Sequence, residues 1–279
     1  MITGASRGLG REIARAFLRE GANVLLCARN PIELEETRKT LEATAKGRVH
    51  SVVTDVTSEA ALDALASEAQ TRLGGVDILV ANAGIQGPKG PFEENDWGKW
   101  VETVRINLLG TAYCCRALLP FLKASERGKI LILSGGGATK PMPFFSAYSA
   151  SKAGVVRFGE TLAEELKPRG IDVNMIAPGA LNTKMLDEVL EAGPEKVGEA
   201  YYRAALKQRD SGGASADRAA DLCVHLASRA CDGITGRLIS APWDNWEQLE
   251  AQRDELAGSD IFTLRRIVPE ERGKKWATP

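Results

Sequence analysis

The chain has 279 residues, a formal net charge of −1, 44% apolar residues and 26% charged residues. It is long enough to bury a sizeable core, and its composition is that of an ordinary globular protein. The near-zero net charge provides no field for gathering nucleic acid or an anionic membrane surface. No apolar run approaches the roughly 18 residues of a membrane span, and no signal peptide precedes the first motif. We therefore expect a cytoplasmic protein.

Five cysteines are spread along the chain: Cys27, Cys114, Cys115, Cys223 and Cys231. They form no CxxC pair, and the chain has only two histidines, so no metal site is expected. We expect buried, reduced thiols.

Short apolar, partly β-branched runs alternate with helical patterns along most of the chain. The apolar runs predict buried strands at residues 22–27, 49–55, 76–81, 129–134 and 171–176. The patterns between them predict helices at residues 10–19, 32–45, 59–72, 97–123 and 147–167. This alternation predicts an α/β fold, a Rossmann-type doubly wound parallel sheet covered on both faces. In such a sheet the ligand crevice lies beyond the carboxyl ends of the strands.

The two ends of the chain fit this pattern less well. Only three residues precede a glycine-rich turn, so the first strand is either very short or begins further upstream. We expect a single domain over residues 1–241. Residues 242–279 then form an extension that packs on this domain or on a neighbouring subunit, as a lid or a subunit contact.

The first motif is the run Thr3-Gly4-Ala5-Ser6-Arg7-Gly8-Leu9-Gly10. Its glycines allow a tight turn and a close approach of the backbone to a pyrophosphate. The helix that opens near Gly10 offers unpaired N–H groups and its positive dipole end to that anion. Alone the motif would be only a glycine-rich turn, but between a strand and an amphipathic helix it predicts a dinucleotide site.

The residues at the end of the second strand are expected to decide between NAD(H) and NADP(H). An acid there would accept hydrogen bonds from the adenosine 2′-hydroxyl and repel a 2′-phosphate. The segment Leu26-Cys27-Ala28-Arg29-Asn30 has no acid. Arg29, together with Arg7 in the glycine turn, provides guanidinium groups that suit a phosphate, although Arg29 could be an ordinary surface arginine. We predict NADP(H) in preference to NAD(H).

Short polar segments end the third and fourth strands. In Asp55-Val56, the aspartate either bonds an adenine amino group or caps the next helix, in competition with Thr57 and Ser58. In Asn82-Ala83-Gly84, the asparagine can hold the crevice backbone together while the two small residues let a ribose approach. Each segment alone fits turn formation as well as ligand binding.

Tyr148 and Lys152 lie four residues apart in a predicted helix, so their side chains project from one face. A nearby ammonium favours the ionised form of a phenol. The spacing therefore predicts a tyrosine with a lowered pKa that works as general acid and base near neutral pH. The alternative is a solvated pair on a helix surface, and the other motifs favour the first interpretation.

In this order, these segments with Asn107, Ser134 and Pro178-Gly179 resemble the short-chain dehydrogenase/reductase family, in its shorter TGxxxGxG and YxxxK branch. The resemblance covers roughly residues 1–240. It implies hydride transfer between NADP(H) and a carbonyl or secondary alcohol substrate, without a metal. It also implies a homodimer or homotetramer, with contacts through the helices at 97–123 and 147–167.

The resemblance implies a role for each matching residue. Tyr148 would exchange a proton with the substrate oxygen, while Lys152 would hold the nicotinamide ribose hydroxyls and, with the oxidised ring, lower the pKa of Tyr148. Asn107 would anchor a water that passes protons to Lys152, unless it is a mid-helix asparagine bonded to its own backbone. Pro178-Gly179, followed by Thr183, would bond the nicotinamide carboxamide.

The chain departs from the family pattern at the serine that orients the substrate oxygen. Family members commonly carry Ser-Ser at the end of the fifth strand, with the second serine thirteen residues before the tyrosine. That position is Gly135 here, and Ser134 lies fourteen residues before Tyr148. We predict that Ser134 takes the role, helped by the flexible run of glycines at 135–137. The alternatives are that the site has no orienting hydroxyl, or that Ser146 supplies it.

Two other functions fit the sequence. The disturbed serine position suits a non-catalytic member that binds the dinucleotide as a sensor or assembly subunit, which the intact Tyr148, Lys152 and Asn107 oppose. A dehydratase or epimerase that recycles its cofactor would use the same groups. Residues 180–213, which set the substrate in this family, mix apolar and charged side chains and favour no substrate class.

Overall fold

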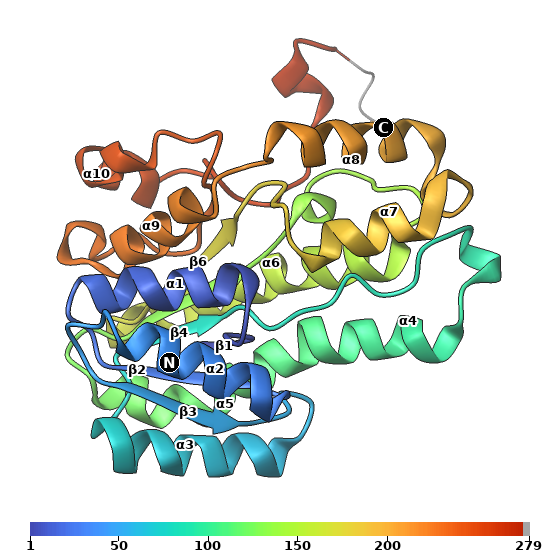
Figure 1. Cartoon of the computed structure of the whole chain (residues 1–279). Helices are drawn as coiled ribbons and strands as arrows, with labels where there is room; N and C mark the ends of the chain where they lie inside the picture. The colour runs from blue at the N-terminus through green and yellow to red at the C-terminus, as the bar shows by residue number, and fades with distance from the viewer. Residues whose placement is uncertain (276–279) are drawn as a thin grey trace.

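The computed structural model describes residues 1–275. Seven parallel strands form one sheet in the order β3-β2-β1-β4-β5-β6-β7. The strands are β1 (Ile2–Thr3), β2 (Val24–Ala28), β3 (Val49–Val53), β4 (Ile78–Ala81), β5 (Lys129–Leu133), β6 (Asp172–Ala177) and β7 (Leu238–Ser240). Helices lie on both sides of the sheet (Figure 1). The predicted doubly wound parallel sheet is confirmed, and only β7 among the strands was not predicted.

Each face of the sheet has its own core. Helices α1 (Gly8–Arg19), α2 (Pro31–Glu42) and α9 (Ala216–Ala227) cover one face, and α3 (Glu59–Leu73), α5 (Gly110–Ala124) and α6 (Ser146–Leu166) cover the other. Alternate strand residues point to opposite cores, so Leu26 and Leu131 enter the first while Leu25 and Ile130 enter the second. Strands buried on both faces need continuous apolar runs, which is why they were visible in the sequence.

Strand β1 has two residues yet lies in the centre of the sheet, between β2 and β4. The Oγ1 atom of Thr3 accepts hydrogen bonds from the backbone N–H groups of Asn82 and Ala83, both at 3.0 Å. This contact fixes the end of β1 against the end of β4. The glycine turn therefore leaves the sheet where the strand order reverses, which is the usual place for a ligand crevice.

The predicted helix at 97–123 is interrupted. It consists of α4 (Trp97–Val104), a π-helical turn (Arg105–Leu109) and α5. The π turn carries Asn107, whose side chain is buried. Such single-turn π segments are frequent at functional sites, and no pattern in the sequence marks this one.

Two helices not predicted from the sequence follow β6. Helix α7 (Lys184–Val197), kinked at Gly193, packs against α8 (Glu199–Ser211) (Figure 1). They share a small core made of Phe145, Leu186, Val189, Val197 and Ala205. Because this core contains Phe145, just before α6, it holds the two helices beside the start of α6.

Residues 241–275 fold back on the same domain, and the last four residues of the predicted extension, 276–279, lie outside the described residues. Apolar side chains of residues 241–275 join the core on the α1 side: Trp246, Leu249 and Leu256. The buried Arg237 donates from Nη1 to the backbone carbonyl of Ser259 at 2.9 Å, and the Leu238 N–H donates to the carbonyl of Phe262 at 2.7 Å. This extension includes a 3₁₀ segment (Trp246–Gln252) and α10 (Arg253–Ala257), and it pairs with the edge strand β7.

All five cysteines are buried and free, as expected. Burial raises the pKa of Cys27 and of Cys115 to about 12, so both thiols stay protonated. Within residues 1–275, no helix combines the length and apolarity needed to span a membrane.

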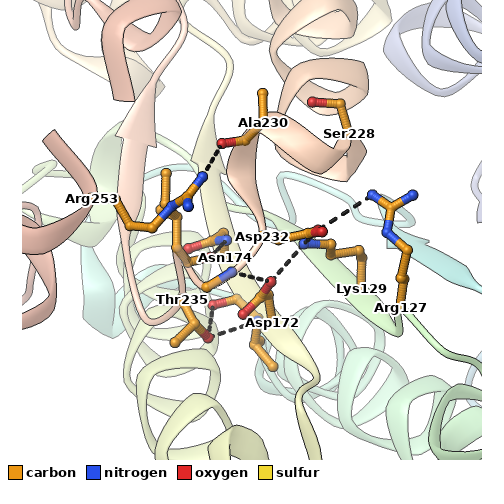
Figure 2. Close-up of polar contacts among 12 residues, drawn as sticks. Arg127, Lys129, Asp172, Asn174, Ser228, Ala230, Asp232, Thr235 and Arg253 are labelled. Atoms are coloured by element: carbon orange, nitrogen blue, oxygen red, sulfur yellow. Dashed lines mark hydrogen bonds and ion pairs between the residues drawn. The ribbon is translucent and has the colours of Figure 1, made fainter. Parts of the chain in front are cut away.

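A cluster of charges joins the amino ends of β5 and β6 to the loop before β7 (Figure 2). Lys129 and Asp172 are largely buried in it, while Asp232 and Arg127 are partly exposed. The side chain of Lys129 is 2% exposed, and its Nζ lies 2.6 Å from Asp172 and 2.7 Å from Asp232. Arg127 donates to Asp232 at 3.3 Å. Burial opposes the ionisation of Asp232, but these two cations outweigh it and lower its pKa. The cluster lies at the end of the strands opposite to the glycine turn.

The substitution K129M should lower the free energy of unfolding by about 3 kcal/mol, because it leaves buried carboxylate without a compensating cation. Urea unfolding followed by circular dichroism measures this loss. The double variant K129M/D172N should regain part of the stability, since it removes charge from both sides. An equal loss in both variants would show that packing of the lysine stem, not its charge, is what matters.

Candidate active site

A cleft of about 1510 Å³ opens at the carboxyl ends of the strands. Most predicted site residues line it: Gly4, Ser6, Arg7, Gly8, Leu9, Gly10, Arg29, Asp55, Val56, Asn82, Ala83, Gly84, Ser134, Tyr148, Lys152, Pro178, Gly179 and Thr183. Thr3 and Asn107 are buried and bond the backbone that lines the cleft. The fold thus brings residues from the carboxyl ends of six strands and from α6 to one place.

The glycine turn fits closely against the end of β4. Gly4 has a φ of +63°, and a Cβ there would lie 2.8 Å from the Cα of Ala83. A Cβ at Gly10 would lie 2.4 Å from the carbonyl oxygen of Gly4. The Nδ2 of Asn82 donates to the carbonyls of Thr3 and Gly4, at 2.9 and 3.2 Å. Only glycine fits these positions, so the turn is compact enough for a phosphate to approach the backbone.

The amino end of α1 is free to bind an anion. Arg7 precedes the helix without a side-chain cap, and the first turn contains no acidic residue. Unpaired N–H groups and the positive end of the helix dipole therefore face the cleft. Across the cleft, Thr183 lies 3.8 Å from the Cβ position of Gly8. A cleft of this size and chemistry fits a nicotinamide dinucleotide.

The β2–α2 end of the cleft carries charges of both signs, which sequence reasoning missed. Arg7 Nη1 donates to both carboxylate oxygens of Glu33 at 3.0 Å, and Ser6 Oγ donates to Glu33 at 3.3 Å. The strand end itself has no acid, but the first turn of α2 brings Glu33 back to the glycine turn. Asn30 sets that turn, because its Oδ1 caps α2. The sequence signal that could have located Glu33 is an acidic residue three positions after a helix-capping asparagine.

Asp55 lines the cleft and also forms a local turn. Its Oδ1 accepts hydrogen bonds from the N–H and the hydroxyl of Thr57, both at 2.9 Å. Ser58, not Asp55, caps α3. Burial opposes ionisation, but the Thr57 hydrogen bonds and the nearby Arg29 lower the pKa of Asp55. Contact with an adenine stays a prediction.

Asn107 links the loop after β4 to α6. Its Oδ1 accepts from the Ile85 N–H at 2.8 Å, and its Nδ2 donates to the Ile85 carbonyl and to Ser151 Oγ, both at 2.9 Å. Ser151 Oγ in turn donates to the carbonyl of Tyr148 at 2.8 Å. The side chain therefore does not bond its own backbone. It fixes the cleft wall relative to the helix that carries Tyr148 and Lys152.

Tyr148 and Lys152 share one face of α6, with Nζ 5.9 Å from the tyrosine ring centre. Lys152 is 5% exposed and donates to the Leu133 carbonyl at 2.7 Å, and burial lowers its pKa to about 8. Burial, with a smaller contribution from Tyr201, raises the pKa of Tyr148 to about 12. The protein groups alone thus do not produce the lowered tyrosine pKa expected from the spacing, because burial raises it.

The two residues at the end of β5 differ in direction. Ser134 Oγ donates to the carbonyl of Lys152 at 3.4 Å, so it faces the α6 backbone. A Cβ built on Gly135 would lie only 2.3 Å from the hydroxyl of Tyr148. The hydroxyl of Ser146, the alternative to Ser134, accepts a hydrogen bond from Trp100 Nε1 at 3.1 Å. Glycine at position 135 therefore makes room for Tyr148, and the geometry favours Ser134 as a support of α6.

A glycine turn at the switch point of a parallel sheet, with a Tyr148–Lys152 pair in the same cleft, is the arrangement expected of a dinucleotide-binding α/β oxidoreductase. The family model for short chain dehydrogenases matches residues 1–193. The chain belongs to the short-chain dehydrogenase/reductase family of oxidoreductases.

Relatives within the family act on diverse substrates. The chain is 32% identical to a 2-dehydro-3-deoxy-L-rhamnonate dehydrogenase (NAD(+)) from Sphingomonas, over 84% of this chain and 90% of the relative. It is 42% identical to 3beta-hydroxysteroid dehydrogenase 1 from Eggerthella lenta, over 70% and 74% of the two chains. These names agree in reaction type and differ in substrate.

Solved structures of similar fold contain the expected class of cofactor. An actinorhodin polyketide ketoreductase variant with NADPH has a TM-score of 0.77 and 31% identity, covering 86% of this chain and 93% of its own. An NADPH-bound oxidoreductase from Pseudomonas aeruginosa, described as containing an atypical catalytic center, has a TM-score of 0.76 and 29% identity, with coverage of 88% and 95%. A nicotinamide dinucleotide is therefore the cofactor class of this cleft.

The substitution K152M should raise stability at pH 7 by about 3 kcal/mol while abolishing turnover. The pKa of Lys152 falls from 10.5 to about 8 on folding, so its buried charge costs stability at neutral pH. Between pH 8 and 10.5 only the unfolded chain keeps the proton, so the wild type gains stability as pH rises. Urea unfolding from pH 7 to 10.5 should show the gap between the two proteins closing. A less stable K152M at pH 7 would contradict this.

Proposed function

We propose that this chain transfers a hydride between NADP(H) and a carbonyl or secondary alcohol, with Tyr148 as the acid and base. The observation that carries the proposal is the position of Tyr148 and Lys152, which face the same cleft as the glycine turn. The dinucleotide, when bound, supplies or accepts the hydride. The chain itself binds, orients and moves a proton.

Each part of the cleft has a task in this reaction. The glycine turn and the amino end of α1 hold the pyrophosphate, and Arg7 with Arg29 holds the 2′-phosphate. Pro178-Gly179 and Thr183 would hold the nicotinamide end, where Lys152 would donate to the ribose hydroxyls. Asn107 keeps this wall in register with α6 and anchors the water that relays protons.

The raised pKa of Tyr148 suits the direction of carbonyl reduction. At neutral pH its hydroxyl carries the proton and can donate it to the substrate oxygen as hydride arrives at carbon. That donation leaves a phenolate, which takes its proton back from solvent through Lys152 and the water relay at Asn107. In the reverse direction the same phenolate must form before it accepts the proton of the alcohol, and in both directions burial opposes the phenolate while a neighbouring positive charge favours it. The intact pair and its Asn107 support favour an enzyme over a dinucleotide sensor.

We also propose a cytoplasmic homodimer or homotetramer. Large apolar side chains are exposed on and near α4, the helix expected to contribute contacts: Phe92, Trp97, Val101 and Leu109. Burying them against a second copy would remove this apolar surface from water. Sedimentation of the purified chain tests the assembly.

The function is tested with a panel of aldehydes, ketones, sugars, quinones and acyl thioesters, following NADPH absorbance. We expect turnover of at least one carbonyl class, and a loss of about 10²–10⁴ in kcat for Y148F, which keeps the ring but has no proton to give. NADPH binding should be retained in Y148F. Binding of NADPH without turnover of any substrate would favour the sensor.

Substitutions at Ser134 and at Gly135 test whether Ser134 orients the substrate oxygen. S134A should keep kcat/KM within about threefold, because its hydroxyl faces the Lys152 carbonyl and such a bond contributes about 1 kcal/mol or less. G135S restores the serine of the family pattern but should lower kcat/KM at least tenfold, since its Cβ would collide with the Tyr148 hydroxyl. G135A, with the same Cβ and no hydroxyl, is the control. A loss in S134A as large as that in Y148F would assign the orienting role to Ser134.

A further inference from the structure

We propose that Glu33 limits the preference for NADP(H), because its carboxylate competes with the adenosine 2′-phosphate for Arg7. This inference rests on the proposed dinucleotide function of the cleft and concerns its selectivity. The sequence contains two arginines at this end of the cleft and no acid at the end of β2, which by itself favours the phosphate. The structure adds an acid to the same place.

Glu33 is held at the glycine turn by several contacts. Arg7 Nη1 donates to both of its carboxylate oxygens at 3.0 Å, and Ser6 Oγ donates to one of them at 3.3 Å. One turn further along α2, Thr37 Oγ1 donates to the carbonyl of Ser6 at 2.6 Å. Helix α2 and the glycine turn are thus joined at two points. These contacts hold the Glu33 carboxylate in place, so it does not behave as a freely moving surface side chain.

The Arg7–Glu33 pair is weak enough to exchange partners. The Arg7 side chain is 54% exposed and that of Glu33 is 35% exposed, so solvent screens their attraction. A 2′-phosphate offers the guanidinium more charge than a carboxylate does, and it can take the same donors. Binding of NADP(H) must then separate Arg7 from Glu33 or place two anions on one guanidinium. Either event reduces the gain that the phosphate would otherwise bring.

The same carboxylate suits the cofactor without the phosphate. A ribose 2′-hydroxyl is a hydrogen-bond donor, and a carboxylate at this end of the cleft can accept from it. Arg29, exposed and without an ion-pair partner among residues 1–275, remains available to a phosphate. The cleft therefore carries Arg29 for the 2′-phosphate of NADP(H) and Glu33 for the 2′-hydroxyl of NAD(H). Arg7 can bond either the phosphate or Glu33.

The experiment compares wild type with E33Q, using 2′,5′-ADP and 5′-AMP as probes that differ in the 2′-phosphate, followed by NADPH and NADH. Isothermal titration gives the dissociation constants without any turnover. We expect E33Q to tighten 2′,5′-ADP and NADPH about fivefold, the size of one partly exposed ion pair, and to leave 5′-AMP and NADH unchanged or weaker. E36Q, which removes the same charge from an exposed residue of α2 outside the cleft, should change none of them.

A second pair of variants tests the role of Arg7. In an R7A background, E33Q should no longer tighten 2′,5′-ADP, because there is no guanidinium left to release. A gain that persists without Arg7, or equal ratios of the two probes in wild type and E33Q, would overturn the proposal. These results differ from failure of the proposed function, in which neither wild type nor E33Q would bind any of the four nucleotides.

Discussion

The site depends on the close contact between the ends of β1 and β4. Two residues of β1 suffice because Thr3 and Asn82 bond across the strand ends, and Gly4 and Gly10 leave no space between them. This contact places the start of α1 at the switch point of the sheet. Everything that faces the cleft from α6, α7 and α2 is arranged around that fixed end.

Burial opposes the ionisation of both Tyr148 and Lys152. Lys152 has no carboxylate partner among residues 1–275, and its Nζ donates to the backbone carbonyl of Leu133. Tyr148 lies so close to Gly135 that a Cβ there would be 2.3 Å from its hydroxyl, so a larger residue would require the tyrosine to move. A buried ammonium and a buried phenol are both costly to ionise, and such costs persist at sites whose ligands or substrates restore the lost interactions. The charged cluster around Lys129 contrasts with this, because there two carboxylates compensate one cation.

The selectivity end of the cleft shows how an argument from local sequence can be incomplete. Arg29 and Arg7 are predicted from the sequence as phosphate ligands, on the ground that the end of β2 carries no acid. Glu33 reaches the same place because an Asn30-capped helix turns back toward the glycine turn. Charge balance at a site is set by what the fold brings together, which spacing along one strand does not show.

The sequence by itself determined the fold class, five of the strands, the glycine turn and the shared face of Tyr148 and Lys152. These follow from apolar runs, glycine spacing and helical periodicity, which are local properties. Tertiary structure alone decided the π turn at Asn107, the packed helix pair α7 and α8, and the course of the residues after β7. It also decided the pKa of Tyr148, the direction of Ser134 and the pairing of Arg7 with Glu33. Burial, and contacts between residues distant in sequence, set these features, so no local pattern contains them.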